Sequence, residues 1–278
     1  MEKTIPFVLS ALLFTSPLVF TSTLLFTSPL MAASNDAEKG REIAEKMDQS
    51  YSGYGTSSAD GEMVLYLGNR EVKRSFRSLT LEDLDNSPSE YNVLVFESPG
   101  DMRGIALLTH ARTEPVDDNQ WLYLPAASRT KRISSSNVSG KFVSSEFSYE
   151  DLAKQEVDEY TYQWLATEPC PNSDLTCEVI ETYPKNKNSG YTKRVIWVDT
   201  DENRAQKVAF YNRHGVHEKT LLLSDYTLPD NGRWRPLTLD MENALNGRRT
   251  VMTWSNYQFG ETLKKNDFKS QRLQTMSR

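Results

Sequence analysis

Beyond its first sixty residues, the chain alternates between turn residues and short segments rich in Val, Ile, Thr, Tyr, Phe and Trp. This pattern predicts β-strands. The segments are residues 62–68, 72–81, 92–98, 103–110, 120–126, 160–167, 177–184, 192–199, 205–212, 218–226, 235–242 and 249–259. Because most connectors are short, consecutive strands should pair antiparallel. A meander of about ten or more strands should curl toward a barrel or half-barrel.

Two stretches break the strand pattern and predict helices. Apolar residues recur at helical spacing from Ala37 to Met47, and a polar residue at 34–36 would cap this helix. Ser148 and Asp151 have the spacing of a capping box that opens a second, short helix. Both helices could cover the concave side of the curled sheet.

Several strands are apolar on both faces. Residues 121–124, 195–198 and 251–254 place large apolar side chains at successive positions. A sheet with one face in water would not need this pattern. Either helices and loops cover both faces, or one face lines an apolar cavity. Apolar stripes are more often packed interior than ligand pockets, so ordinary core is the first expectation.

The N-terminus has the layout of a secretory signal. Lys3 precedes a long apolar stretch, and small residues ending at Ala33 stand just before a polar segment. We expect residues 1–33 to be a signal peptide cleaved near Ala33. An uncleaved membrane anchor is the competing interpretation, but prolines interrupt the apolar stretch. No linker interrupts residues 34–278, which should form a single domain.

Charge and motifs argue against several function classes. The net charge of −6 and the pI near 5.3 make a general nucleic-acid binder an unfavourable interpretation. The sequence contains no nucleophile elbow, P-loop or dinucleotide fingerprint. His214 and His217 fall in a probable hairpin turn without a third ligand, which favours a surface turn over a metal site. We therefore expect no catalytic residue, metal or cofactor, and no enzymatic activity.

The two cysteines predict a local disulfide. Cys170 and Cys177 bracket a turn-forming stretch, and in an exported chain such a pair closes a short loop. The stabilisation expected from loop closure is roughly 2 to 3 kcal/mol. Two thiols without a nearby His do not complete a zinc site.

A basic cluster directly follows the strand at 120–126. It consists of Arg129, Lys131 and Arg132. Edge strands commonly carry Lys and Arg, so a solvated edge is one interpretation. The other is a cationic rim beside an apolar surface, which would suit an amphiphile with an anionic head.

Four segments, in order along the chain, match a known pattern. They are "DNQWLYLPAASRTKRISSS", "SEFSYEDL", "RVIWVD" with the following "KVAFYNRHGVHEKTLLLSDY", and "RPLTLDMENALNGRRTVMTWSNYQF" with a late "DF" at 267–268. Together they resemble the bacterial outer-membrane lipoprotein-sorting protein family, a LolA-like group. The resemblance implies an α+β fold with a large curled antiparallel sheet, an unclosed half-barrel of about eleven strands. Helices would cover its concave face, and acyl chains would occupy a hydrophobic cavity.

The resemblance also implies a function and changes the interpretation of the apolar stripes. We expect a periplasmic carrier that binds acyl chains of lipids or lipoproteins and moves them between envelope membranes. Such a carrier needs an apolar cavity and an openable cover, but no catalytic group. The expected cavity wall consists of Trp121, Tyr123, Trp197, Phe210, Met252 and Trp254. Residues 121–124 would form a central strand, with the basic cluster near the cavity mouth or on an exposed rim.

Partners follow from the same resemblance. Members of this LolA-like branch are often associated with RND-superfamily exporters, so an inner-membrane RND-type exporter is an expected partner of a monomeric carrier. The alternative function is a periplasmic lipid-sensing or adaptor protein for such an exporter. An enzyme acting on an envelope lipid is the least favoured possibility.

Overall fold

The computed structural model describes Met1 and residues 29–113, 116–171 and 173–277. The expected signal peptide therefore lies almost entirely outside the described residues. Helix α1 (Pro29–Tyr51) begins before residue 34, so residues 34–36 lie inside the helix instead of capping it. Leu, Met and Ala at 30–33 are good helix formers, which accounts for the earlier start. Within the described chain, no helix has both the length and the apolarity that a membrane span requires.

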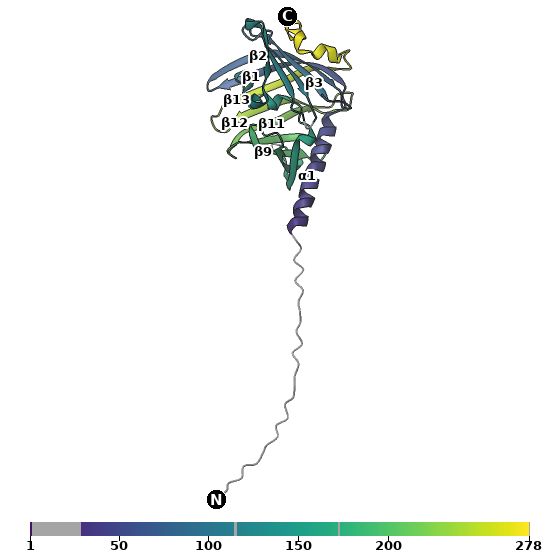
Figure 1. Ribbon diagram of the computed structural model, residues 1–278, viewed down its shortest axis with the longest axis vertical. Coiled ribbons are helices and arrows are strands. Elements are labelled where there is room, and N and C mark those ends of the chain that lie inside the picture. Colours follow the sequence, from purple (N-terminus) through teal and green to yellow (C-terminus); the bar gives the residue numbers. More distant parts are fainter. Residues whose placement is uncertain (2–28, 114–115, 172, 278) are drawn as a thin grey trace.

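One antiparallel sheet of thirteen strands dominates the fold (Figure 1). Its strands are β1 (Thr56–Leu67), β2 (Arg70–Glu82), β3 (Glu90–Ser98), β4 (Ala106–Ala111), β5 (Asn119–Leu124), β6 (Arg129–Ile133), β7 (Tyr160–Pro169), β8 (Thr176–Pro184), β9 (Tyr191–Asp199), β10 (Ala205–Asn212), β11 (His217–Thr227), β12 (Arg235–Asn243) and β13 (Arg249–Phe259). Their order in the sheet is β6-β5-β4-β3-β2-β1-β13-β12-β11-β10-β9-β8-β7. The α+β half-barrel expected from the sequence is confirmed, with thirteen strands in place of about eleven.

The strand order explains why the sheet stays open. Except for β6 and β7, strands that follow one another in the chain are paired in the sheet. Because β1 also pairs with β13, β6 and β7 are left as the two edges. Residues 134–159 connect these edges. We call this connection the strap. A segment that links the two edges of an unclosed half-barrel has to cross its open side, so the topology itself supplies a cover.

The strand at 120–126 is not central, contrary to the sequence-based expectation. It forms β5, which lies second from the edge, and the basic cluster belongs to the edge strand β6. Four of the five residues of β6 are exposed. A strand with so few apolar side chains lacks the pattern that identified the others, which is why it was missed.

The sheet carries apolar side chains on both of its faces. The inner face, covered by α1 and the strap, holds the main core, which includes Met63, Phe76 and Ile196. On the outer face, β3 to β5 pack against Phe268 and Leu273 of the C-terminal segment. This segment comprises η6 (Lys265–Phe268), η7 (Ser270–Arg272) and α2 (Leu273–Met276), drawn in yellow beside β3 in Figure 1. Packing on both faces therefore accounts for strands that are apolar on both sides.

Close approach of α1 to the sheet requires a glycine. A Cβ atom on Gly40 would lie 2.9 Å from the backbone nitrogen of Trp164 in β7. Ile43 and Ala44, one turn further along, are buried in the main core. The helix is thereby held against the β7 edge, where it forms one wall of the interior described below.

The predicted disulfide is present. Cys170 and Cys177 are bonded and their Cα atoms lie 4.9 Å apart. The bridge closes the turn between β7 and β8. Because β7 is an edge strand, the bridge secures an element that has a sheet partner on one side only.

Candidate functional site

The inner face of the sheet encloses an apolar chamber next to α1. Its volume is about 360 Å³. Ala44 and Met47 of α1 form one side, and apolar residues of β9, β10 and β11 form the other, including Val208, Phe210 and Leu221. Ligand pockets are typically concave and mainly apolar, with a few polar groups placed among the apolar ones. We call this space the first chamber.

A second chamber of about 390 Å³ lies next to the first under the strap. Leu94, Leu107, Met252 and Trp254 contribute to its wall. Five residues line both spaces: Tyr54, Glu90, Asp151, Lys154 and Arg235. These residues, here called the junction, lie at the boundary between the two chambers. Other polar side chains also line the chambers, among them Glu82 and Arg194 in the first and Thr80 and Asn92 in the second.

Burial sets the protonation of the junction. Tyr54 donates a hydrogen bond from its hydroxyl to Glu90 Oε2 at 3.0 Å. Burial raises the pKa of Glu90 to about 7, against the smaller opposing effect of the Lys154 charge. Lys154 pairs with Glu156, with 3.1 Å between Nζ and Oε1. Near neutral pH, the Glu90 carboxyl is therefore protonated in a substantial fraction of molecules.

The strap packs aromatic side chains into the main core beside the chambers. Phe142, Phe147 and Tyr149 are buried in the main core, and the Phe142 ring stacks on Phe96 of β3 with 5.7 Å between centroids. The strap contains short 3₁₀ turns but no α-helix. Apolar packing therefore holds this part of the strap on the sheet. The strap residues that line the chambers are of mixed polarity: Asp151, Leu152, Ala153, Lys154, Gln155 and Val157.

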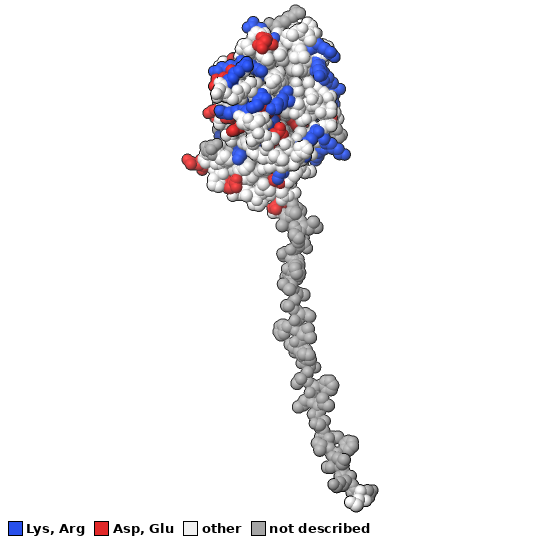
Figure 2. All heavy atoms as spheres, turned by 90° about the vertical axis from the view of Figure 1, so that its left-hand side faces the viewer, with Lys and Arg blue, Asp and Glu red and all other residues white. Residues whose placement is uncertain are grey.

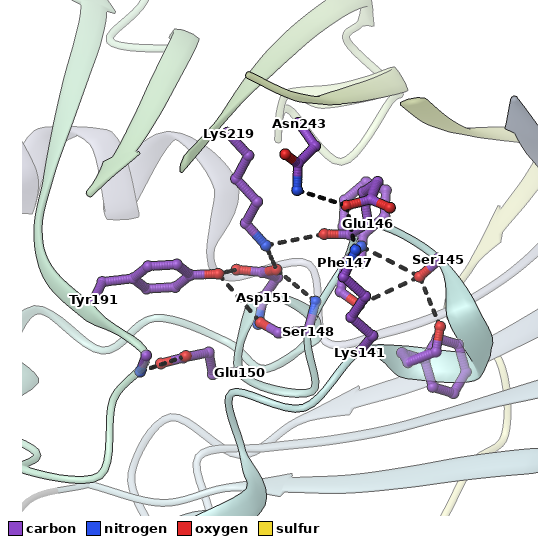
Figure 3. A network of polar contacts seen from close by, with 12 residues as sticks. Lys141, Ser145, Glu146, Phe147, Ser148, Glu150, Asp151, Tyr191, Lys219 and Asn243 are labelled. Carbon is purple, nitrogen blue, oxygen red and sulfur yellow. Dashed lines mark hydrogen bonds and ion pairs between the residues drawn. The ribbon is translucent and has the colours of Figure 1, made fainter. Parts of the chain in front are cut away.

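Buried polar contacts fasten the strap to the sheet (Figure 3). Lys219 Nζ of β11 lies 2.5 Å from Asp151 Oδ2 and donates to the backbone oxygen of Glu146 at 3.0 Å. The hydroxyl of Tyr191 in β9 donates to Asp151 Oδ1 at 2.8 Å. Asn243 of β12 donates to Glu146 Oε2 at 2.9 Å. Three strands thus hold the strap through two carboxylates.

The predicted capping box is present, but the helix it opens is very short. The Ser148 amide donates to Asp151 Oδ2 at 2.6 Å, and the Asp151 amide donates to Ser148 Oγ at 3.3 Å. Only the 3₁₀ turn η4 (Glu150–Leu152) follows. The carboxylate of Asp151 also binds Lys219 and Tyr191, so its partners lie mainly in the sheet.

Half of the residues expected in the cavity wall face the interior. Phe210 lines the first chamber, and Met252 and Trp254 line the second. Trp121 and Tyr123 pack on the outer face with the C-terminal segment. For these two, the expectation requires correction, because their alternate neighbours Leu122 and Leu124 point into the main core.

Trp197 needs the same correction. It packs on the outer face of β9 beside Val195, and its indole nitrogen donates to Glu168 Oε1 at 2.6 Å. Ile196 takes the inward position and lines the first chamber. The sequence could not distinguish the two faces, because both are apolar in β5 and β9.

The basic cluster does not line either chamber. Arg129, Lys131 and Arg132 are exposed on β6. The register pairs Arg129 with Leu124 and Lys131 with Leu122, so both cations lie on the inner-face side of the edge. The edge-strand interpretation is confirmed, and a rim role for these residues stays a prediction.

The junction was not recognised from the sequence. Glu90 and Arg235 each begin a strand, at positions where a charged residue would ordinarily be solvated. No local motif marks them, because they come together only when β3 and β12 curl toward the same interior. Among described residues, no group of three or more His, Cys, Asp or Glu is arranged to hold a metal ion.

Comparison with solved structures identifies the family. A domain from Vibrio parahaemolyticus, described as an outer membrane lipoprotein-sorting protein domain, is 39% identical to this chain with a TM-score of 0.82. The match covers 86% of this chain and 99% of that one. The chain belongs to the outer-membrane lipoprotein-sorting protein family. A family model described as an uncharacterized protein matches residues 88–275.

Two further solved structures are similar to this chain. A DUF1329 family protein from Desulfovibrio piger is 29% identical, with a TM-score of 0.80 over 86% of this chain and 99% of that one. A LolA superfamily protein from Nitrosomonas europaea shares the fold, at 22% identity and a TM-score of 0.65 over 83% and 97% of the two chains. Comparison with curated proteins gave no match. The lipoprotein-sorting family resemblance and its half-barrel are therefore confirmed.

Proposed function

We propose that this protein binds acyl chains of lipids or lipoproteins in its two chambers and carries them between envelope membranes. The observation that supports this most is the pair of adjoining chambers, about 360 and 390 Å³, between the inner face of the sheet, α1 and the strap. Ligand pockets commonly span roughly 300 to 1,000 Å³. Together the chambers offer space for a long aliphatic chain.

Physical chemistry explains why such a carrier needs no catalytic group. Each buried methylene contributes about 0.8 kcal/mol, so a long acyl chain leaves a membrane for water at a cost of roughly 10 kcal/mol. A protein interior of similar apolarity removes most of this barrier. The strap, held to the sheet by polar contacts at Glu146 and Asp151, would then move aside for loading and release.

The cellular setting is part of the proposal. A periplasmic location, reached through a cleaved N-terminal signal, fits the layout of residues 1–33 and the family membership. An RND-type inner-membrane exporter as partner, and a monomeric carrier without enzymatic activity, remain predictions. The alternative is a lipid-sensing or adaptor protein for such an exporter, which would not transfer lipid between membranes.

A substitution that fills the first chamber should reduce binding of a fluorescent fatty acid. Leu221 lines this chamber, whereas Leu222, its neighbour on β11, lies in a surface hollow on the outer face. Leu221→Trp is expected to weaken uptake about tenfold, equivalent to the loss of two buried methylenes. Leu222→Trp is the matched control and should bind as wild type. Equal binding by both variants in a fluorescence titration would contradict the proposed cavity.

The basic cluster gives a second prediction, concerning transfer. Figure 2 shows Lys and Arg side chains gathered on one face of the molecule, despite a net charge of −6. If β6 contacts anionic lipid heads, Arg129→Glu with Lys131→Glu should slow fatty-acid transfer to anionic vesicles severalfold at low salt. The thermal midpoint should not change, because both side chains are exposed. Unchanged transfer would exclude this role.

A further inference from the structure

Arg235 is a buried cation that lacks a partner of opposite charge. It begins β12, is only 9% exposed and lines both chambers. Its Nη1 atom donates to the backbone oxygens of Tyr51 and Trp234, at 2.7 and 2.8 Å. Its Nη2 atom is buried and has no hydrogen-bond partner among the described residues. A buried guanidinium satisfied on one side only leaves one directional donor available to a ligand.

The surroundings hold the guanidinium in place without neutralising it. Its carbon lies 4.1 Å from the centroid of the Tyr54 ring, a cation–π contact that fixes the plane of the group. Of the two carboxyls at the junction, Asp151 pairs with Lys219, and Glu90 accepts a hydrogen bond from Tyr54. Burial favours the protonated form of Glu90 by raising its pKa to about 7. The positive charge of Arg235 is therefore poorly compensated within the protein.

A buried charge is costly unless it is paired. The two apolar chambers meet at this charge, so an amphiphile that placed its chain in a chamber would bring its head group to the junction. We propose that Arg235 binds the anionic head, a carboxylate or a phosphate, of an amphiphile whose acyl chain occupies a chamber. This deepens the proposed function and rests on it, because it assigns an anionic cargo class to the same interior.

The assignment separates Arg235 from the other cations of the interior. Lys154 lines the same junction but is paired with Glu156, and Lys219 is paired with Asp151. Arg74, also buried, donates from Nη1 to the backbone oxygen of Val143 in the strap, and it lines neither chamber. Arg194, also buried, lines only the first chamber and donates to Thr182 and Gln155. Of these five buried or half-buried cations, only Arg235 combines a position at both chambers with a donor that has no partner.

The test compares three ligands that have the same chain and different heads. Oleate, oleoyl lysophosphatidate and oleyl alcohol would displace a neutral fluorescent probe, N-phenylnaphthylamine, from the full-length protein at pH 6, where the Glu90 carboxyl is mainly protonated. Arg235→Met is expected to weaken one or both anionic ligands by about 10-fold to 100-fold, the loss associated with a charge-assisted hydrogen bond. Oleyl alcohol should change less than about twofold, because its contacts are apolar. Comparison of oleate with lysophosphatidate shows whether the head is a carboxylate or a phosphate.

Two variants serve as controls. Arg249→Met removes an exposed arginine that pairs with Asp240 and lines neither chamber, so all three affinities should stay at wild-type values. Arg235→Lys keeps the charge and should recover part of the anion affinity. Circular dichroism of Arg235→Met shows, independently of ligand binding, that the variant is folded.

Each outcome decides the assignment. Selective loss of anion binding in Arg235→Met supports it. Equal weakening of oleate, lysophosphatidate and oleyl alcohol, or no weakening of any, overturns it while the cavity function stands. Failure of the wild-type protein to take up any of the three ligands would overturn the proposed function and the role of Arg235 together.

Discussion

Replacing Lys219 with Met is expected to lower the free energy of unfolding by about 3 to 5 kcal/mol, because it leaves a buried carboxylate unpaired. The side chains of Lys219 and Asp151 are only 5% and 4% exposed. Lys219 also donates to the backbone of Glu146, so the substitution removes two attachments of the strap at once. Chemical denaturation of wild type and variant, followed by tryptophan fluorescence, measures the difference.

The double variant separates lost charge pairing from lost packing. Lys219→Met combined with Asp151→Asn removes both charges and should be more stable than Lys219→Met alone, since no uncompensated charge stays buried. Lys46→Met is the surface control: Lys46 pairs with Glu42 on α1, where about half of each side chain is exposed, and its loss should change stability by less than about 0.5 kcal/mol. A Lys219→Met variant within about 1 kcal/mol of wild type would contradict the fastening role of this pair.

The second large effect concerns pH. The stability of the wild-type protein is expected to fall as the pH rises from 5 to 8. Burial raises the pKa of Glu90 to about 7, of Asp118 to about 7 and of Glu159 to about 8. In the unfolded chain these carboxyls titrate near pH 4. Between the two values the folded state holds protons that the unfolded state has released, so the stabilisation is complete below about pH 4 and is lost as the pH rises through 7 to 8.

The Glu90→Gln variant tests whether Glu90 causes this pH dependence of stability. The substitution keeps an oxygen acceptor for the Tyr54 hydroxyl and removes the titrating carboxyl. The decrease in unfolding free energy between pH 5 and 8 should shrink by an amount on the order of 2 to 3 kcal/mol. Glu62→Gln, at an exposed position of β1, should reproduce the wild-type profile. If Glu90→Gln and wild type lose stability in parallel across this range, the carboxyl of Glu90 is not the source of the pH dependence.

Strand periodicity predicted most of the sheet, because twelve of the strands carry apolar side chains where the pleat requires them. The exception is β6, whose exposed Arg and Lys side chains carry no burial pattern. Backbone hydrogen bonds with β5 fix the position of β6, and backbone pairing does not require a particular pattern of side chains. The disulfide and the hydrogen bonds of the capping box were also predicted correctly, because each depends on residues that lie close together in the sequence.

The candidate site was predicted in part, and the failures have a common cause. Trp121 and Trp197 were placed in the cavity because they are large and apolar, yet the C-terminal segment and outer-face side chains account for them. In a strand with two apolar faces, composition does not tell the inner face from the outer one. Arg235 and Glu90 were missed for a different reason: their significance comes from the burial that the curled sheet imposes on strand ends.

The most direct test of the central claim is native mass spectrometry, with lipid extraction, of protein purified without detergent from the periplasm of a Gram-negative host. The account predicts a stoichiometric acylated species that is retained by Leu222→Trp and depleted in Leu221→Trp. An unliganded wild-type protein that also fails to take up a fluorescent fatty acid would contradict it and favour the adaptor role.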